Sequence, residues 1–179
     1  MPASTAAAAS FWSDRTEKRL ATREVRAYRA TSVLGLILLS HFTARALGFR
    51  RIWHVGYNGA YLLAALTFGG IFFAWWARIH LGRLWSGSIT RKEGHHVVDT
   101  GPYAIVRHPI YTGLIGATFA TAVSIGTLAA IVGALLMTFG FWIKARLEES
   151  FLSEQLEEGA YQSYRRRVPM LLPFGRPSA

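Results

Sequence analysis

The 179-residue chain contains no cysteine. This excludes a disulfide framework, a thiolate metal site and a cysteine nucleophile. The sequence has neither a GxGxxG nor a GxxxxGK[S/T] segment, so it supports neither soluble nucleotide-binding motif. Its six histidines form no HExxH pair, and we therefore expect no metal site.

Charged residues are missing from long stretches of the chain. The segment from Leu62 to Ala77 is apolar, and extending it back to Tyr57 gives about 20 residues, which is enough to cross a hydrocarbon core. The segment from Ile110 to Ile143 carries no charge and must fold back on itself, with a hairpin near Ser124–Thr127. The alternative is a soluble helical protein, but two tandem uncharged helices are hard to bury in a chain of this size.

These runs predict an all-α, polytopic integral membrane helical bundle with about four transmembrane helices. The expected spans are residues 30–47, 57–77, 109–125 and 128–147. We expect a tail and an interfacial helix before them (1–29), a loop carrying the cofactor site at 82–108, and a C-terminal helix and tail at 144–179. Glycines in the second span, together with Gly113, Ala117 and Thr121 in the third, predict close helix packing.

Basic residues outnumber acidic ones by 20 to 10. They gather before the first span, between the second and third, and after the fourth, which predicts that both termini and the active site are cytoplasmic. Arg45, Arg50 and Arg51 fall on the opposite side in this scheme. Because the basic residues follow the span ends and form no single patch, we expect anionic membrane lipids as partners and no nucleic acid.

Polar and turn-forming residues crowd into one segment, His95–Gly113, which reads HHVVDTGPYAIVRHPIYTG. A helix should begin at Pro109, because the residue before proline avoids the α conformation and proline suits a first helical turn. Its free backbone N–H groups, with donors on Tyr103, Arg107, His108 and Tyr111, predict a pocket for a polar or anionic group.

Two adjacent carboxylates follow on the last apolar helix. Glu148 and Glu149 are about 100° apart on a helix, so one should face the pocket while the other pairs with a base. Lys144 lies four residues before Glu148 and should meet it on one face. We expect this helix to continue past Ile143 toward Gly159, and the tail after it to pack back over the same end.

The segment HHVVDTGPYAIVRHPIYTG, followed by KARLEESFLSEQLEEGAYQSYRRRVPMLLPF, resembles the isoprenylcysteine carboxyl methyltransferase family, whose relatives include membrane phospholipid methyltransferases. The resemblance covers about Leu81–Phe174. It implies a membrane protein that binds S-adenosylmethionine in a cytoplasmic pocket and receives a lipophilic or prenylated acceptor from the bilayer. The residues that it implies for the cofactor are His95, Val97, Val98, Tyr103, His108, Pro109, Tyr111 and Glu148.

The resemblance also implies residues for the reaction. Arg107 would shape the pocket near the transferred methyl group. The family places an arginine toward the acceptor where this chain has Lys144, with Arg146 nearby, and lysine lacks the bidentate clamp of arginine. A carboxylate acceptor is already ionised and would need only a cation to orient it. For an amine or thiol acceptor, Glu149 would be the nearest base.

Two other functions fit parts of this pattern. A sterol-type membrane reductase using NADPH carries a similar RHPxYxG element, but this chain has Ile110 where that class has asparagine. A non-enzymatic protein could use the same scaffold to bind lipid. Binding of a methyl donor, of NADPH, or of neither would separate the three.

Overall fold

A computed structural model describes residues 22–82, 97–155 and 159–175, and these residues form helices and loops with no β-strand. His95 and His96 lie outside the described residues. The elements are α2 (Thr22–Leu39), α3 (His41–Ala46), α4 (Tyr57–Leu81), the short 3-10 helix η2 (Gly101–Ala104), α5 (Pro109–Ile125), α6 (Leu128–Gln155) and α7 (Ala160–Arg167).

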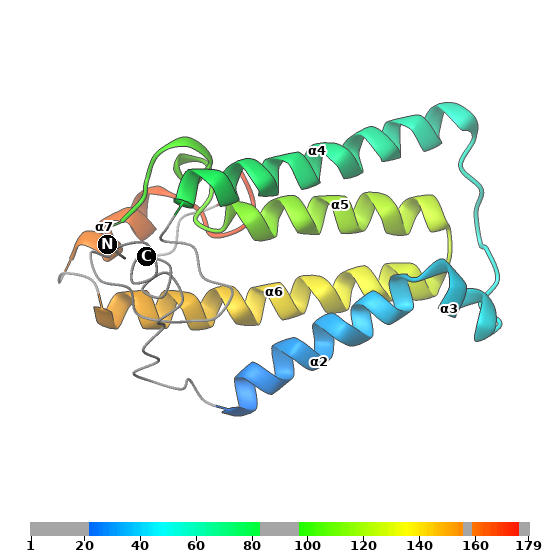
Figure 1. Ribbon diagram of the computed structural model, residues 1–179, viewed down its shortest axis with the longest axis horizontal. Coiled ribbons are helices and arrows are strands. Elements are labelled where there is room, and N and C mark those ends of the chain that lie inside the picture. Colours follow the sequence, from blue (N-terminus) through cyan, green and yellow to red (C-terminus); the bar gives the residue numbers. More distant parts are fainter. Residues whose placement is uncertain (1–21, 83–96, 156–158, 176–179) are drawn as a thin grey trace, which may run out of the picture.

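The four long helices lie side by side in the order α4, α5, α6, α2 (Figure 1). The all-α prediction is confirmed for the described residues. The connection between α5 and α6 lies at one end of the bundle, near α3, while η2 and α7 lie at the other end. That second end, which we call the polar end, holds the candidate site.

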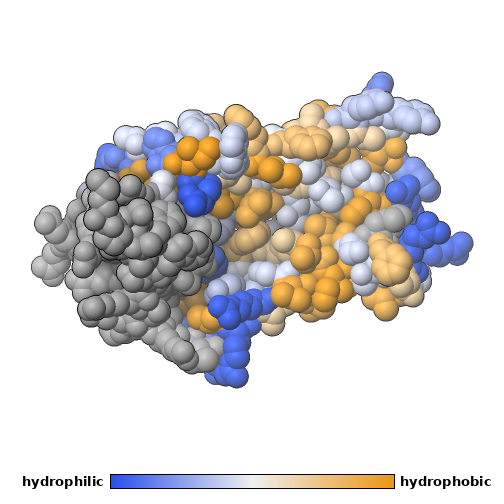
Figure 2. Space-filling model, in the orientation of Figure 1, coloured by the Kyte–Doolittle hydropathy of each residue, from blue (hydrophilic) through white to orange (hydrophobic). Residues whose placement is uncertain are grey.

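Among the described residues, two helices are long and apolar enough to cross a membrane: Tyr57–Leu81 and Leu128–Ser153. In the most apolar part of each helix, only 11% is buried in Tyr57–Leu81 and 33% in Leu128–Ser153. Helices in a soluble core would be mostly covered, whereas here large apolar side chains face outward, as Figure 2 shows over the middle of the bundle. Helix α5 is apolar but shorter.

The N-terminal part of the fold differs from the expected division. Residues 30–47, predicted as one span, form two helices, because Ser40 interrupts them with an extended backbone (φ −67°, ψ 122°) and caps α3. A serine side chain that accepts from a backbone N–H stabilises a new helix start at that point. Helix α2 also runs through residue 30, the expected boundary between an interfacial helix and the first span.

Pairs of glycines bring the helices together at two points. A Cβ on Gly70 would lie 2.5 Å from the carbonyl oxygen of Gly113, and one on Gly113 would lie 2.4 Å from that of Gly70. The same reciprocal arrangement joins Gly35 of α2 to Gly133 of α6, at 2.6 Å in both directions. The prediction of close packing by small residues is confirmed for α4 and α5.

The predicted turn between α5 and α6 is confirmed. Helix α5 ends at Ile125, the next residue, Gly126, adopts a left-handed conformation (φ 74°), and α6 begins at Leu128. The chain before α4 covers this turn, since the Arg51 side chain donates to the carbonyl of Ile125 at 3.0 Å and the Trp53 indole donates to that of Val123 at 2.9 Å. Two of the carbonyls in the last turn of α5 are thereby satisfied.

Candidate functional site

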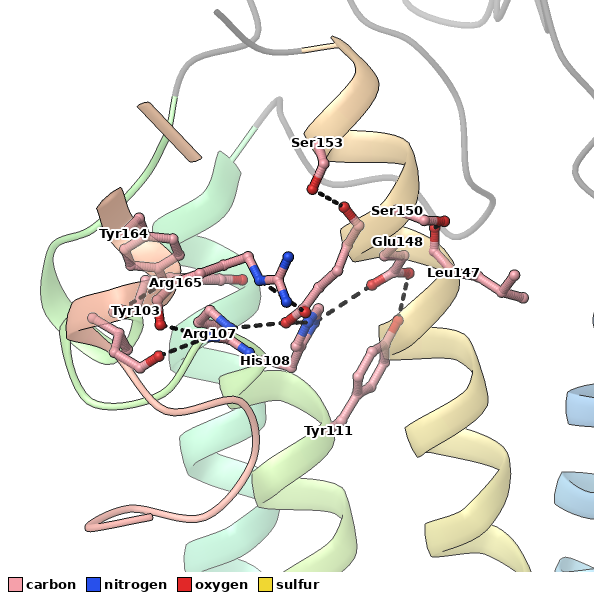
Figure 3. A network of polar contacts seen from close by, with 12 residues as sticks. Tyr103, Arg107, His108, Tyr111, Leu147, Glu148, Ser150, Ser153, Tyr164 and Arg165 are labelled. Carbon is pink, nitrogen blue, oxygen red and sulfur yellow. Dashed lines mark hydrogen bonds and ion pairs between the residues drawn. The ribbon is translucent and has the colours of Figure 1, made fainter. Parts of the chain in front are cut away.

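The predicted helix start at Pro109 is confirmed and places the polar residues of the site. His108 takes a non-helical conformation (φ −122°, ψ 64°), and Pro109 occupies the first turn of α5. Tyr111 therefore points from the first turn toward α6, while Arg107 and His108 come from the segment just before it (Figure 3). Tyr103, Val106, Arg107 and His108 are all buried.

Tyr111 and Glu148 are in direct contact. The Tyr111 hydroxyl donates to Glu148 Oε1 at 2.6 Å, and its ring stacks on His108 and on Phe141 with centroids 5.6 and 5.3 Å apart. Lys144 Nζ lies 3.9 Å from the same carboxylate oxygen, which confirms that Lys144 and Glu148 share one face of α6. The Glu148 side chain remains 22% exposed, so a ligand can reach it.

Glu149 contacts a different set of groups from Glu148, as two adjacent residues on a helix should. Arg107 Nε donates to its Oε1 at 2.8 Å, and His108 Nε2 lies 3.2 Å from the same oxygen. Arg165 Nε lies 3.6 Å from Oε2. With its side chain only 5% exposed, Glu149 is a buried carboxylate compensated by nearby cations.

His108 lies between the two carboxylates. Its Nδ1 is 3.6 Å from Glu148 Oε2, while its Nε2 faces Glu149. The ring therefore joins the partly exposed glutamate to the buried one, and its position is fixed by stacking on Tyr111.

Arg107 connects the site to the C-terminal segment. Besides Glu149, its guanidinium donates through one terminal nitrogen to the carbonyls of Arg165 (2.8 Å) and Val168 (3.0 Å). The backbone N–H groups of Arg107 and His108 donate to the carbonyls of Pro169 and Met170 at 2.8 and 3.1 Å. The tail thus packs back against the polar end, as predicted.

An aromatic cluster fixes α7 over η2. The Tyr164 hydroxyl donates to the Tyr103 carbonyl at 2.7 Å, and Tyr161, Tyr164 and Val168 form a core against which Val97 and Leu152 pack. Burial raises the pKa of both the Tyr103 and the Tyr164 phenol, because it disfavours the charged form. Tyr164 therefore remains a neutral hydrogen-bond donor.

The remaining predicted residues are placed less centrally. Val97 and Val98 are half-buried, and Val97 contacts the α7 core. Arg146 is exposed, with its guanidinium carbon 5.3 Å from the Trp142 ring centroid.

The structure adds residues that the sequence reasoning missed. His80, near the end of α4, has Nε2 2.9 Å from Thr100 Oγ1, and its ring stacks on Tyr103. Arg165 joins Glu149, and Tyr28 of α2 lies beside Lys144. Each comes from a segment distant in sequence from its partner, so no local motif signalled the contact.

Comparison with known proteins decides the family. The sequence model of the isoprenylcysteine carboxyl methyltransferase (ICMT) family matches residues 62–154, which is more than half of the chain. The chain belongs to the ICMT family. The match includes most of α4, all of α5, most of α6 and every predicted site residue. The family match and the outward-facing apolar helices together identify this ICMT-family chain as a membrane protein.

Individual relatives carry different names. The nickel-cobalt-cadmium resistance protein NccN of Alcaligenes xylosoxydans xylosoxydans is 34% identical over 125 residues, covering 67% of this chain and 55% of that protein. Protein-S-isoprenylcysteine O-methyltransferase B of Arabidopsis thaliana is 34% identical over 87 residues (48% and 44%). Methanethiol S-methyltransferase of a Pseudomonas strain is 42% identical over 71 residues (40% and 26%). The chain thus spans about half or less of each relative's length.

The resistance protein's name raises the question of a metal site. Among the described residues, no group of three or more histidine, aspartate or glutamate side chains is placed to hold a metal ion. This finding does not extend to His95 and His96, which the structure does not describe.

Proposed function

We propose that this ICMT-family protein is an S-adenosylmethionine-dependent methyltransferase that acts on a lipophilic acceptor. The observation that carries the proposal is the contact between Tyr111 and Glu148, which joins the RHPIY segment to the last long helix inside the family-matched region. Names of two relatives specify methyl transfer, one to an isoprenylcysteine and one to a thiol. Neither the reductase nor the non-enzymatic alternative has such support.

The residues present fit this cofactor. S-adenosylmethionine brings a methyl group activated on a sulfonium, together with a cationic amino group and an aromatic base. A partly exposed carboxylate on Glu148 can bind the cationic amino group, and Tyr111 orients that carboxylate with a 2.6 Å hydrogen bond. The backbone near Val97 and Val98, with Tyr103, His108 and Pro109, supplies further contacts, and the family pattern adds His95.

The buried groups around Glu149 stabilise the site. For an amine or thiol acceptor, Glu149 was the predicted base. Its carboxylate is already held by Arg107, His108 and Arg165, so removing a proton from an acceptor would require breaking these contacts. We therefore propose that Glu149 and Arg107 act as positioning residues that hold His108 and the C-terminal segment in place.

Lys144 is the group that we propose for the acceptor. Its ammonium lies next to Glu148 at the polar end, and a cation near the methyl donor can orient an ionised carboxylate without acid–base chemistry. Arg146 is exposed on the same helix and would contribute charge at longer range. The proposed acceptor is therefore an amphiphile whose apolar part lies in the bilayer and whose carboxylate reaches Lys144.

The four-span arrangement is also part of the proposal. Helices α4 and α6 have the length and apolar composition to cross a bilayer, and we propose that α2 and α5 cross beside them. The polar end would then lie at the cytoplasmic surface with both termini, where basic residues such as Arg23, Arg26 and Arg29 of α2 gather.

The test is incubation of membranes containing the protein with methyl-labelled S-adenosylmethionine, followed by mass spectrometry of the labelled products. The proposal expects a lipid-soluble product that is absent when the Glu148→Ala variant is used. Transfer of label that does not depend on Glu148 would refute the site, and NADPH consumption without methyl transfer would refute the reaction.

A further inference from the structure

The Lys144 ammonium lies between two aromatic rings. Its Nζ is 5.4 Å from the centroid of the Tyr111 ring on α5 and 5.8 Å from that of the Tyr28 ring on α2. Both distances are within the range of a cation–π interaction. The lysine side chain is only 18% exposed, so most of it is removed from water.

The backbone fixes Tyr28 in this place. Gly140 precedes Lys144 by one helical turn on the same face of α6, and a Cβ on Gly140 would lie 3.1 Å from the Tyr28 carbonyl oxygen. The same Cβ would lie 2.6 Å from Ser32 Oγ and 2.9 Å from Thr31 Oγ1. Helices α2 and α6 are therefore in close contact at this level, which holds the backbone of Tyr28 near Lys144.

Tyr28 lies outside the segment that matches the ICMT family, which begins at residue 62. The site residues predicted by resemblance come from α5, α6 and the segment before α5. Helix α2 thus adds a side chain to the site that the family pattern does not specify.

We infer that Tyr28 is a positioning residue that orients the Lys144 ammonium toward an anionic acceptor group. A lysine side chain is long and flexible, and its ammonium would otherwise sample many positions. The rings of Tyr28 and Tyr111 and the Glu148 carboxylate together restrict the ammonium to one position. This inference rests on the proposed function, and it deepens that proposal by making Tyr28 and helix α2 part of the acceptor-binding site.

The test compares a ligand that carries a free carboxylate, N-acetyl-S-farnesylcysteine, with its uncharged methyl ester, by equilibrium binding to the detergent-purified protein. The free acid should bind more tightly than the ester. Tyr28→Leu should reduce that preference by about three- to tenfold, as expected for loss of a partly desolvated cation–π contact. Tyr28→Phe, which keeps the ring, should retain the preference.

Two controls separate this effect from general damage. Tyr61→Leu, at an exposed position on α4, should leave the preference unchanged. S-adenosylmethionine affinity should be the same in Tyr28→Leu as in the unmodified protein, since Tyr28 has no assigned contact with the donor. The inference would be overturned if Tyr28→Leu preferred the acid over the ester as strongly as the unmodified protein does. It would also be overturned if the unmodified protein showed no such preference. Absence of donor binding in the unmodified protein would instead refute the proposed function, while the acid and ester comparison still decides the role of Tyr28.

Discussion

The Tyr111 hydroxyl donates to Glu148 Oε1 at 2.6 Å, although the two residues are 37 positions apart in the sequence. This bond joins the first turn of α5 to α6 at the polar end of the bundle. Glu148 keeps part of its surface exposed, whereas Glu149 beside it is buried among Arg107, His108 and Arg165. The two glutamates are thus suited to different tasks, ligand binding and structural support.

Tyr111→Phe should weaken methyl-donor binding. The substitution keeps the rings stacked and removes only the hydroxyl that orients Glu148. A hydrogen bond to a charged group contributes about 1.5–3 kcal/mol, so we expect a roughly tenfold or larger loss of affinity. Isothermal titration with S-adenosylmethionine measures it, and Tyr57→Phe, at an exposed position at the far end of α4, is the matched control. An unchanged affinity in Tyr111→Phe would show that the bond does not serve the donor.

Arg107→Ala should strongly destabilise the protein. It leaves the buried Glu149 carboxylate without its closest cation and removes two hydrogen bonds to α7 and the following residue. Breaking a buried ion pair costs about 3–5 kcal/mol. Arg167→Ala removes the exposed pair with Asp99 and should change the free energy of unfolding by less than about 1 kcal/mol. Thermal unfolding in detergent compares them, and equal effects would contradict the assigned role of Arg107.

Replacing Gly70 of α4 by alanine should lower the stability of the protein, whereas replacing the adjacent Gly69 should raise it. At Gly70 the new Cβ would lie 2.5 Å from the Gly113 carbonyl oxygen, so α4 and α5 must move apart. At Gly69 it would meet nothing within 4 Å, and alanine should stabilise the helix by up to about 1 kcal/mol. Melting temperatures of the two variants in the same detergent test this. A Gly70→Ala variant as stable as Gly69→Ala would mean that the helices are not in close contact.

The protein should remain in membranes after a carbonate wash and dissolve only in detergent. Its α4 and α6 expose large apolar side chains, among them Phe68, Phe72 and Leu135, to the surroundings. Immunoblotting of the washed pellet and supernatant is the measurement. Recovery of the intact chain in the aqueous supernatant would favour the soluble alternative.

Much of the fold followed from local signals. Proline after His108 set the start of α5, Gly126 set its end, and long uncharged runs marked the apolar helices. The break at Ser40 did not follow, because a serine inside an apolar run is also common within helices, and only the cap geometry shows that a second helix begins there. The expected boundary at residue 30 relied on charge, which does not interrupt a helix.

The site was predictable only in part. Spacing on one helix placed Lys144 beside Glu148 and separated Glu148 from Glu149. Contacts between segments were beyond such reasoning. The stacking of His80 on Tyr103, the approach of Arg165 to Glu149 and the position of Tyr28 depend on how α2, α4 and α7 pack around α6 and η2. No spacing in the sequence encodes these tertiary contacts.

The most direct test of the account is isothermal titration of the detergent-purified protein with S-adenosylmethionine, alongside its Glu148→Ala and Tyr111→Ala variants. We predict saturable binding in the micromolar range for the unmodified protein and no measurable binding for either variant, provided that each variant keeps its thermal transition. Unchanged affinity in both variants would contradict a donor site built on Tyr111 and Glu148.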